Sequence, residues 1–469
     1  MGTGVGPAGV TEIASSVRQG DRTVLDVLEE ALERIALGNP ALNAFVALDP
    51  DRAREEAAAV DARVRAGEDP GPLAGVPVGV KDLEDAQGFV TTHGDPAYAD
   101  DPPSAVDSVE VARLKSAGAV VVGKTNTPPH GVRAETDNRV FGPSRNPWAT
   151  TRTPGGSSGG SGAAVAAGLV PLATGSDGGG SIRIPSAVCG LPGFKATHGV
   201  VPNADVGAPA WGPFSTRGPM ARSFADIAVA LDVVKGLSNR DILSVEVPGS
   251  FSDAVERRSV DGLRVAWSHT LGVADVDPRV IAACEVGIGA LQDAGARVEA
   301  VGKVLDEDPL GAWGARSAPG TRHHFNQRDM AWSERFDEAS LLLAGMAEFV
   351  DMDMLLDGEA GAHAVLLALA DVFDRFDLLA CPATLTVPPK VGEESPYGPG
   401  WAATMTMPFN LTRSPAAVVP VGLVEDDGDR LPVAIQIAGP RLSDLRVMSA
   451  AAGLEEILDP IAPRPHRVL

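Results

Sequence analysis

The chain has 469 residues, of which 44% are hydrophobic and 22% charged, a composition that excludes an intrinsically disordered or fibrous protein. Its 39 Lys and Arg stand against 62 Asp and Glu, so the formal net charge is −23. Such a charge repels a phosphate backbone. We therefore expect a globular protein that does not bind nucleic acid.

The three cysteines, Cys189, Cys284 and Cys381, are widely spaced and odd in number, which indicates reduced thiols in the cytoplasm rather than a disulfide framework. Cys189 lies in an apolar run and is expected to be a small buried hydrophobic residue. No HExxH or CxxC pattern occurs, so we expect no metal and no cofactor. The chain has neither a signal-peptide pattern nor an apolar stretch of about 20 residues, so we expect no membrane association.

The predicted elements begin with a helical arm. Apolar residues recur at helical spacing over residues 10–37, and a break at Gly20 predicts two helices. Apolar runs at 74–80 and 118–123 follow helical stretches and predict strands, the first of which ends at Lys81. This alternation favours a mixed or parallel sheet covered on both faces.

The second half of the chain repeats the alternation. Residues 263–268 and 297–301 are predicted strands on either side of a helix over 278–295, with Asp277 as its N-cap. This order resembles a βαβ unit. It again favours an α/β fold.

Near the C-terminus, apolar runs at 416–424 and 431–439 flank the turn pair Asp427-Gly428, which predicts an antiparallel hairpin. Residues 237–262 are polar and turn-rich, and residues 303–360 show no clear register, so both are predicted surface excursions. The expected fold is α/β, with a central twisted mixed β-sheet covered by helices on both faces. We expect one domain over 1–469, with a helical arm at about 8–65, a core at about 70–235 and a C-terminal part at about 260–465.

Between Arg152 and Ile184, glycine and serine crowd both ends of a small-residue helix, Ala163–Gly168. A flexible linker does not fit, because an apolar helix joins the two glycine runs. A phosphate-binding loop does not fit either, because Ser161 stands where its lysine is needed. A GxSxG match centred on Ser158 suggests the nucleophile of an α/β-hydrolase-type esterase, although no strand is predicted before it; this alternative stays open.

The run from Asp177 to Ser181 has three consecutive residues without a Cβ. Such a backbone can aim successive N–H groups at one point beside the Ser181 hydroxyl, as an oxyanion hole requires. A serine nucleophile needs a base, and Lys81, at the end of an apolar strand, is the candidate because burial lowers the pKa of an amine. The predicted oxyanion donors are the N–H groups of Gly178, Gly179, Gly180 and Ser181.

Together these motifs resemble the amidase signature family over essentially the whole chain. In that family the lysine of the KD pair is the base, the first serine of GGSSGG relays protons from a cis peptide, and the serine that closes DxGGS is the nucleophile. The resemblance therefore implies the amidase signature fold and a catalytic triad of Lys81, Ser157 and Ser181. The segments that carry it are GVPVGVKD (75–82), GKTNTP (123–128), FGPSRNPW (141–148), PGGSSGGSGAAVAAG (154–168), GSDGGGSIRIPSAVCGLPGFKAT (175–197), GPMAR (218–222) and PFNLTRSPAAVVPVG (408–422).

Supporting residues are expected around this triad. By the family pattern, Ser158 hydrogen-bonds the lysine, the alternative being a solvated loop serine. Asp177 and Arg183 are expected to brace the loop as a pair, the alternative being a surface ion pair. Candidate substrate contacts, each with ordinary packing as its alternative, are His130, Gly131, Val132, Trp211 and Phe214.

The resemblance implies a hydrolase of small-molecule amides, esters or carbamates (urethanes) that works through a seryl acyl-enzyme, in the branch of stand-alone amidases, aryl acylamidases and urethanases. The family also includes the glutaminase component of glutamyl-tRNA amidotransferase, in which a Thr follows the aspartate and a Gln follows the IR pair. Here Gly178 and Ile184 stand at those positions, and the charge of −23 suits a tRNA-binding surface poorly. We rank the stand-alone hydrolase first, and the sequence leaves a homodimer open.

Overall fold

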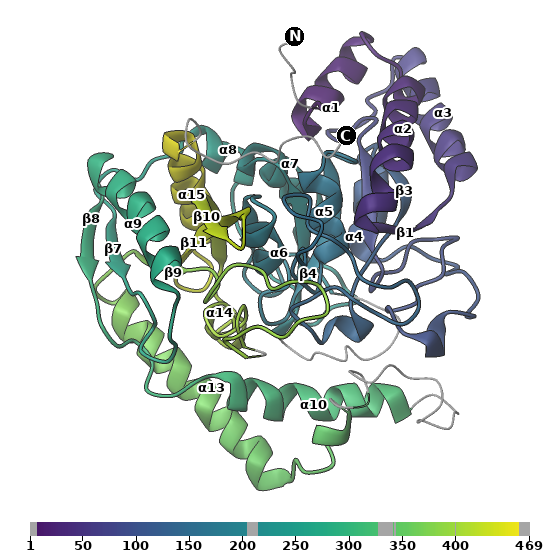
Figure 1. Ribbon diagram of the computed structural model, residues 1–469. Helices are drawn as coiled ribbons and strands as arrows, with labels where there is room; N and C mark the ends of the chain where they lie inside the picture. The colour runs from purple at the N-terminus through teal and green to yellow at the C-terminus, as the bar shows by residue number, and fades with distance from the viewer. Residues whose placement is uncertain (1–6, 204–213, 327–340, 342–343, 399, 459–469) are drawn as a thin grey trace.

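The computed structural model describes residues 7–203, 214–326, 341, 344–398 and 400–458. It has the α/β architecture expected from the sequence, with mixed sheets and helices on both sides (Figure 1). The strands form two hydrogen-bonded sheets, where the sequence predicted one central sheet. Strand β5 (Gly193–Lys195) lies beside β6 (Thr216–Ala221), but no ladder joins them.

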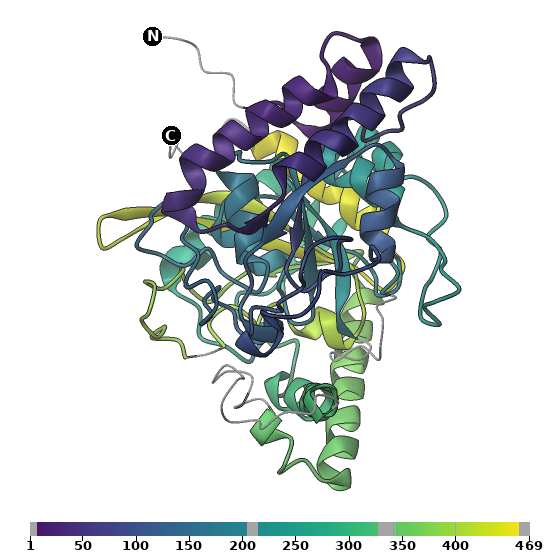
Figure 2. The ribbon, with the colours of Figure 1, turned by 90° about the vertical axis from the view of Figure 1, so that its right-hand side faces the viewer.

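The two helices predicted over residues 10–37 are confirmed. Helix α1 (Val10–Gln19) buries one apolar face and ends at Gly20, whose φ of 76° is the left-handed cap that glycine adopts without strain. Helix α2 (Val24–Leu42) begins at Thr23, whose side chain accepts a hydrogen bond from the Asp26 N–H. With α3 (Pro50–Arg65), these helices cover one end of the molecule (Figure 2).

The first sheet has the order β1-β3-β2-β4-β6. Strands β2 and β4 are parallel neighbours, so their carboxyl ends meet at the same edge of the sheet. Lys81 ends β2 and Asp177 ends β4, which brings the two predicted motifs together there. The bounds of its remaining strands are β1 (Phe45–Leu48), β3 (Val120–Thr125), β2 (Pro77–Lys81) and β4 (Leu172–Asp177).

The second sheet has the order β5-β10-β11-β9-β7-β8. The predicted hairpin is confirmed, with positive φ at both Asp427 and Gly428, as a type I′ turn requires. The predicted βαβ unit is confirmed too, because β7 and β8 are parallel. The elements are β7 (Arg264–Trp267), α9 (Pro278–Asp293), β8 (Arg297–Ala300), β9 (Leu378–Pro382), β10 (Ala416–Asp426) and β11 (Asp429–Ala438).

Helices cover both sheets and share one large apolar core with them. None of the helices in the described ranges is long and apolar enough to cross a membrane. Cys189, Cys284 and Cys381 are buried free thiols, so Cys189 is the buried residue expected. The covering helices are α4 (Val109–Ser116), α5 (Gly159–Ala166), α6 (Arg183–Val188), α7 (Phe224–Val234), α14 (Pro408–Leu411) and α15 (Asp444–Leu458).

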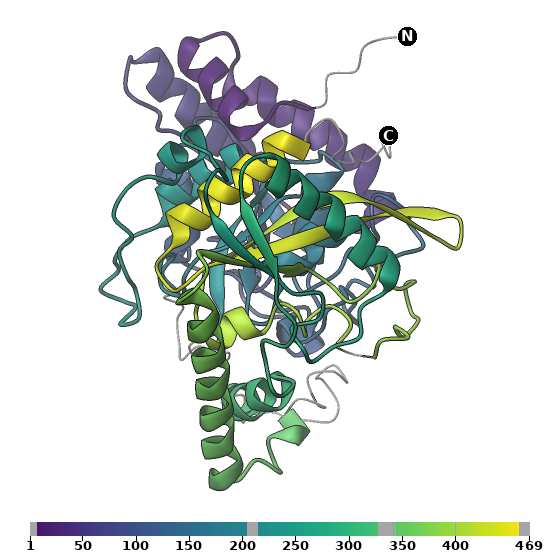
Figure 3. The same cartoon turned by 90° about the vertical axis from the view of Figure 1, so that its left-hand side faces the viewer.

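The sequence pattern missed helices within the two predicted excursions, and one helix that begins in the second and ends beyond it. They are α8 (Phe251–Glu256), α10 (Leu310–Asn326) and α13 (Met352–Phe373). Helix α10 contains Pro319 and several glycines, and α13 exposes Leu356, Leu366 and Leu367, so neither shows a clean amphipathic period. Helices α10 and α13 lie together at the end of the molecule opposite α1–α3 (Figures 1 and 3).

Candidate active site

Lys81 is buried at the end of β2 with only 1% of its surface exposed. Its Nζ lies 2.7 Å from Ser157 Oγ, 2.9 Å from Ser158 Oγ and 2.9 Å from Ser176 Oγ. Among the described residues, no carboxylate forms an ion pair with it. The amine is therefore surrounded by hydroxyl groups.

This environment lowers the pKa of Lys81 to about 7. Burial is the largest cause, since an ammonium ion loses its hydration there; Asp177 and Glu84 raise the pKa, and Arg217 lowers it further. Close to neutral pH, a substantial fraction of Lys81 is a neutral amine that can accept a proton.

Ser157 and Ser158 lie in the turn before α5. The peptide bond between Gly156 and Ser157 is cis. A Cβ on Gly131 would lie 3.0 Å from Ser157 Oγ, so a glycine at 131 lets its turn approach this hydroxyl closely. The Ser158 N–H donates to the Ser181 carbonyl at 3.2 Å, which holds the Ser181 backbone beside the same turn.

The loop from Asp177 to Ser181 is fixed through its carbonyl oxygens. Each of four successive carbonyls accepts a hydrogen bond at 2.6–2.8 Å from a different donor. The donor and acceptor pairs are Asn410 Nδ2 with Asp177, Trp313 Nε1 with Gly178, Thr406 Oγ1 with Gly179, and the Ile184 N–H with Gly180.

The N–H groups of this loop differ in what they bond. Within the described part of the chain, those of Gly178, Gly179 and Ser181 donate to no protein acceptor, and these three residues are partly exposed. Gly180 differs from the prediction, because its N–H donates to Asp177 Oδ1 at 2.8 Å and the residue is buried. Its φ of 132°, and the 2.2 Å that would separate a Cβ from Thr406 Oγ1, explain why glycine is needed there.

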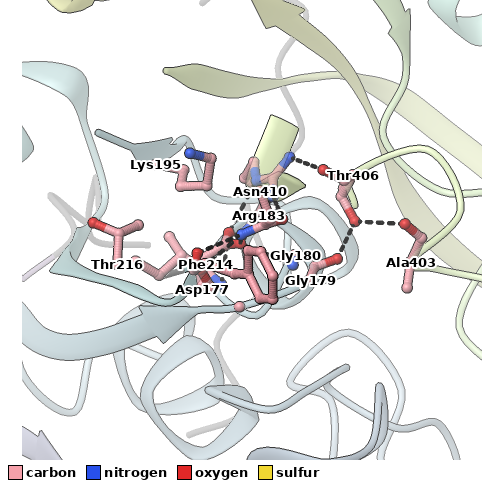
Figure 4. A network of polar contacts seen from close by, with 12 residues as sticks. Asp177, Gly179, Gly180, Arg183, Lys195, Phe214, Thr216, Ala403, Thr406 and Asn410 are labelled. Carbon is pink, nitrogen blue, oxygen red and sulfur yellow. Dashed lines mark hydrogen bonds and ion pairs between the residues drawn. The ribbon is translucent and has the colours of Figure 1, made fainter. Parts of the chain in front are cut away.

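Asp177 and Arg183 form a fully buried ion pair, at 2.8 Å, rather than a surface one. Arg183 also donates to Thr406 O, Gln436 Oε1 and Asn410 Oδ1, which ties the loop to the C-terminal half of the chain (Figure 4). Burial would raise the pKa of Asp177, but Arg183 holds it well below its usual range. The carboxylate stays charged and anchors the loop.

The predicted substrate contacts are only partly brought to this site. Gly131 lies against Ser157, and Val132 caps the same turn. His130 is buried, with its ring among those of His93, Tyr98 and Phe325 and its Nε2 3.5 Å from Asp95 Oδ2.

The two aromatic residues of the 200–217 loop gave different outcomes. Phe214 is 2% exposed, and the Arg316 guanidinium covers its ring at 4.3 Å. Trp211 lies outside the described residues.

The structure does not support Ser158 as an esterase nucleophile. Ser158 is fully buried, and the residues before it form no strand, so no nucleophile elbow exists. Its hydroxyl also bonds Lys81 and both the carbonyl and the N–H of Ser176, which uses its full hydrogen-bonding capacity.

Sequence reasoning missed four residues that touch the site: Ser176, Thr406, Asn410 and Trp313. Ser176 had a local signal, since it directly precedes Asp177 on the strand. Asn410 stands in the family-like segment 408–422, but nothing there marked its contact with this loop. Thr406 and Trp313 had no local signal, because they are more than 100 residues away along the chain. In the described ranges, no three His, Cys, Asp or Glu side chains are placed to hold a metal ion.

Comparisons with known proteins show which family the chain belongs to. The family model described as Amidase matches residues 26–306 and 335–448. The chain is 35% identical to an acylamidase of Rhodococcus erythropolis, over 95% of this chain and 94% of that one. It is 34% identical to a glutamyl-tRNA(Gln) amidotransferase component of Synechococcus sp. (strain RCC307), over 97% and 98%.

Among solved structures, a bacterial aryl acylamidase of the amidase signature family matches with a TM-score of 0.90 and 32% identity, covering 97% of this chain and 96% of that one. The chain belongs to the amidase family. It is an amidohydrolase with the amidase signature fold, similar to the aryl acylamidase.

Proposed function

We propose that this enzyme hydrolyses amides through a seryl acyl-enzyme, with Ser181 as nucleophile, Ser157 as proton relay and Lys81 as base. The observation that carries the proposal is the buried Lys81 amine, which has three serine hydroxyls and no carboxylate as its partners in the described chain. A neutral amine has two N–H donors and one lone pair. Ser158 has no hydrogen left for Lys81, so Lys81 donates to it and keeps its lone pair for another hydroxyl.

The short contact between Lys81 Nζ and Ser157 Oγ supports Ser157 as the hydroxyl that donates to the lone pair. At 2.7 Å, the Ser157 hydroxyl donates to Lys81 and its oxygen can accept the proton of Ser181. Ser181 then attacks the amide carbonyl, and the N–H groups of Gly178, Gly179 and Ser181 stabilise the oxyanion. The same relay returns the proton to the leaving amine of the substrate. Water then hydrolyses the acyl-enzyme.

The proposed substrates are apolar or aryl amides, with aryl esters and carbamates as further substrates of the same mechanism. The likeness to an acylamidase and to an aryl acylamidase supports this class. A carbamate has an oxygen substituent on its carbonyl carbon where an amide has a carbon. The serine attacks that carbonyl in the same way, so the acyl-transfer steps are the same.

Labelling with a serine-directed aryl phosphonate, followed by peptide mass spectrometry, tests the proposed nucleophile. We expect one adduct, on Ser181, and none in Ser181→Ala. An adduct on Ser157 or Ser158 would overturn the assignment. Rates with a panel of chromogenic anilides, aryl esters and aryl carbamates would then rank the leaving groups.

A glutaminase like the amidotransferase component is the second candidate, because the chain also resembles that protein over nearly its whole length. Binding the carboxylate of free glutamine needs a positioned cation. Arg133, exposed beside the Gly131 turn, is the candidate cation, whereas Arg183 is committed to Asp177. Faster hydrolysis of glutamine than of an anilide, lost in Arg133→Ala, would favour this second function.

A further inference from the structure

Trp313 links a helix outside the sheets to the loop that carries Ser181. Its indole N–H donates to the Gly178 carbonyl at 2.8 Å, and the indole packs against Gly179, where a Cβ would lie 3.6 Å from Nε1. Trp313 belongs to α10, in the region between β8 and β9 that the sequence pattern could not interpret. None of the family-like motifs includes it.

The bond matters because of the geometry of a peptide unit. In a trans peptide, the carbonyl and the N–H of one unit point in opposite directions. The unit between Gly178 and Gly179 therefore points the Gly179 N–H away from Trp313. Glycine on both sides leaves this unit free to rotate unless a partner holds it.

The neighbouring units are held by residues of the core. Asn410, whose side-chain oxygen accepts from Arg183, fixes the unit before Gly178. Thr406 and Asp177 fix the unit between Gly179 and Gly180. Among the described residues, Trp313 is the one donor to the unit between them.

Helix α10 is anchored well enough to serve as a support. Arg316, one turn after Trp313, stacks on the buried Phe214 ring at 4.3 Å. At the far end of the helix, the Phe325 ring lies 4.5 Å from the His130 ring. The helix thus contacts the protein around both the Ser181 loop and the Gly131 turn.

We infer that Trp313 is a positioning residue of the oxyanion hole: its indole N–H holds the Gly178 carbonyl and so aims the Gly179 N–H at the substrate oxygen. This inference rests on the proposed acyl-enzyme. It predicts that loss of the indole N–H weakens stabilisation of the transition state and leaves substrate binding unchanged.

The test is Trp313→Phe, which keeps an aromatic ring and removes the donor. Loss of a whole oxyanion donor costs about 10²- to 10³-fold in kcat, so a misaimed donor should cost roughly tenfold, with KM unchanged. A trifluoromethyl ketone, which forms an oxyanion on the nucleophile, should lose affinity by the same factor. In the infrared spectrum of the acyl-enzyme, the ester carbonyl stretch should move to higher frequency.

Two controls make the test specific. Trp148→Phe removes a comparable bond, from a half-buried indole N–H to the Cys189 carbonyl at 2.9 Å, and should leave kcat and the carbonyl frequency unchanged. If Trp313→Phe folds poorly, 3-benzothienylalanine at position 313 replaces only the N–H group and should give the same shifts.

An unchanged kcat and carbonyl frequency in a folded variant at 313 would overturn the inference. A rise in KM alone would make Trp313 a wall of the substrate site and overturn it equally. These outcomes differ from failure of the proposed function, in which the wild-type acyl group would be found on a residue other than Ser181.

Discussion

Two buried lysines lie near one another at the ends of adjacent parallel strands, and they differ in what surrounds their amines. Lys81 ends β2 and faces three serine hydroxyls. Lys124 lies on β3, opposite Val80, and its Nζ contacts Asp82 Oδ1 at 3.2 Å and the Glu84 carbonyl at 2.6 Å. Neither side chain is more than 1% exposed.

The difference shows how a fold separates a lysine in a buried ion pair from the lysine proposed as the base. A buried carboxylate partner repays part of the cost of burying a charge, so Lys124 forms an ion pair that braces two strands. Burial lowers the pKa of Lys81 to about 7, and its hydroxyl partners accommodate a neutral amine, so Lys81 can lose its proton close to neutral pH. Partners, rather than burial itself, distinguish the two lysines.

Lys81→Met should have the largest effect on activity. The variant removes the base, and methionine fills much of the same volume while the Ser158 hydroxyl keeps its bonds to the Ser176 backbone. We expect kcat for an anilide to fall by about 10⁴-fold with little change in the free energy of unfolding. Steady-state kinetics and urea denaturation measure both, and retention of a tenth of the activity would contradict the role of Lys81.

Lys124→Met should do the reverse. Asp82 would remain buried without its cation, a situation that costs about 3–5 kcal/mol. Burial already raises the pKa of Asp82, and Lys124 opposes that rise. We expect a large fall in the free energy of unfolding in urea and near-normal kcat per folded molecule; a stable variant would show that the pair contributes little.

Ser176→Ala should have a smaller effect than Lys81→Met, because it removes one of three hydroxyls that hold the amine. We expect kcat/KM to fall by about tenfold. Ser161→Ala is the matched control, since the buried Ser161 hydroxyl bonds Thr125 and the Thr174 carbonyl instead. Equal losses in the two variants would mean that Ser176 acts only through stability.

His198→Asn should have the smallest effect. Burial, with Arg413 as a second cause, lowers the pKa of His198 to about 4, so it is a neutral imidazole at pH 7. Because the proposed relay uses lysine and serine, activity per folded molecule should stay at the wild-type level. Loss of activity as complete as that of Lys81→Met would make histidine the base.

The comparison also shows what the sequence could predict. Local sequence motifs mark the residues Lys81, Ser157, Ser158 and Asp177. The parallel strands β2 and β4 bring Lys81 and Asp177 to the same edge of the sheet. The hairpin and the βαβ unit followed from apolar periodicity and turn residues.

Other features depend on contacts between distant segments. The sequence predicted the Gly180 N–H as an oxyanion donor, but this group donates a hydrogen bond to the Asp177 carboxylate. No local pattern distinguishes an N–H that faces the substrate from one that bonds a side chain. Trp313 and Asn410 reach the loop only through tertiary packing. Helix α13 was missed because apolar residues on several faces conceal its periodicity, and α10 because Pro319 and several glycines interrupt the helical pattern.

The pH dependence of Ser181 labelling by an aryl phosphonate tests the central claim most directly, because it measures activation of the nucleophile without turnover. Since the pKa of Lys81 is lowered to about 7, the neutral amine predominates above that pH. The labelling rate should rise tenfold per pH unit below the midpoint and become constant above it. A rate that is flat from about pH 5 to pH 9, or that continues to rise to about pH 10 as an ordinary lysine would dictate, would contradict a neutral Lys81 base.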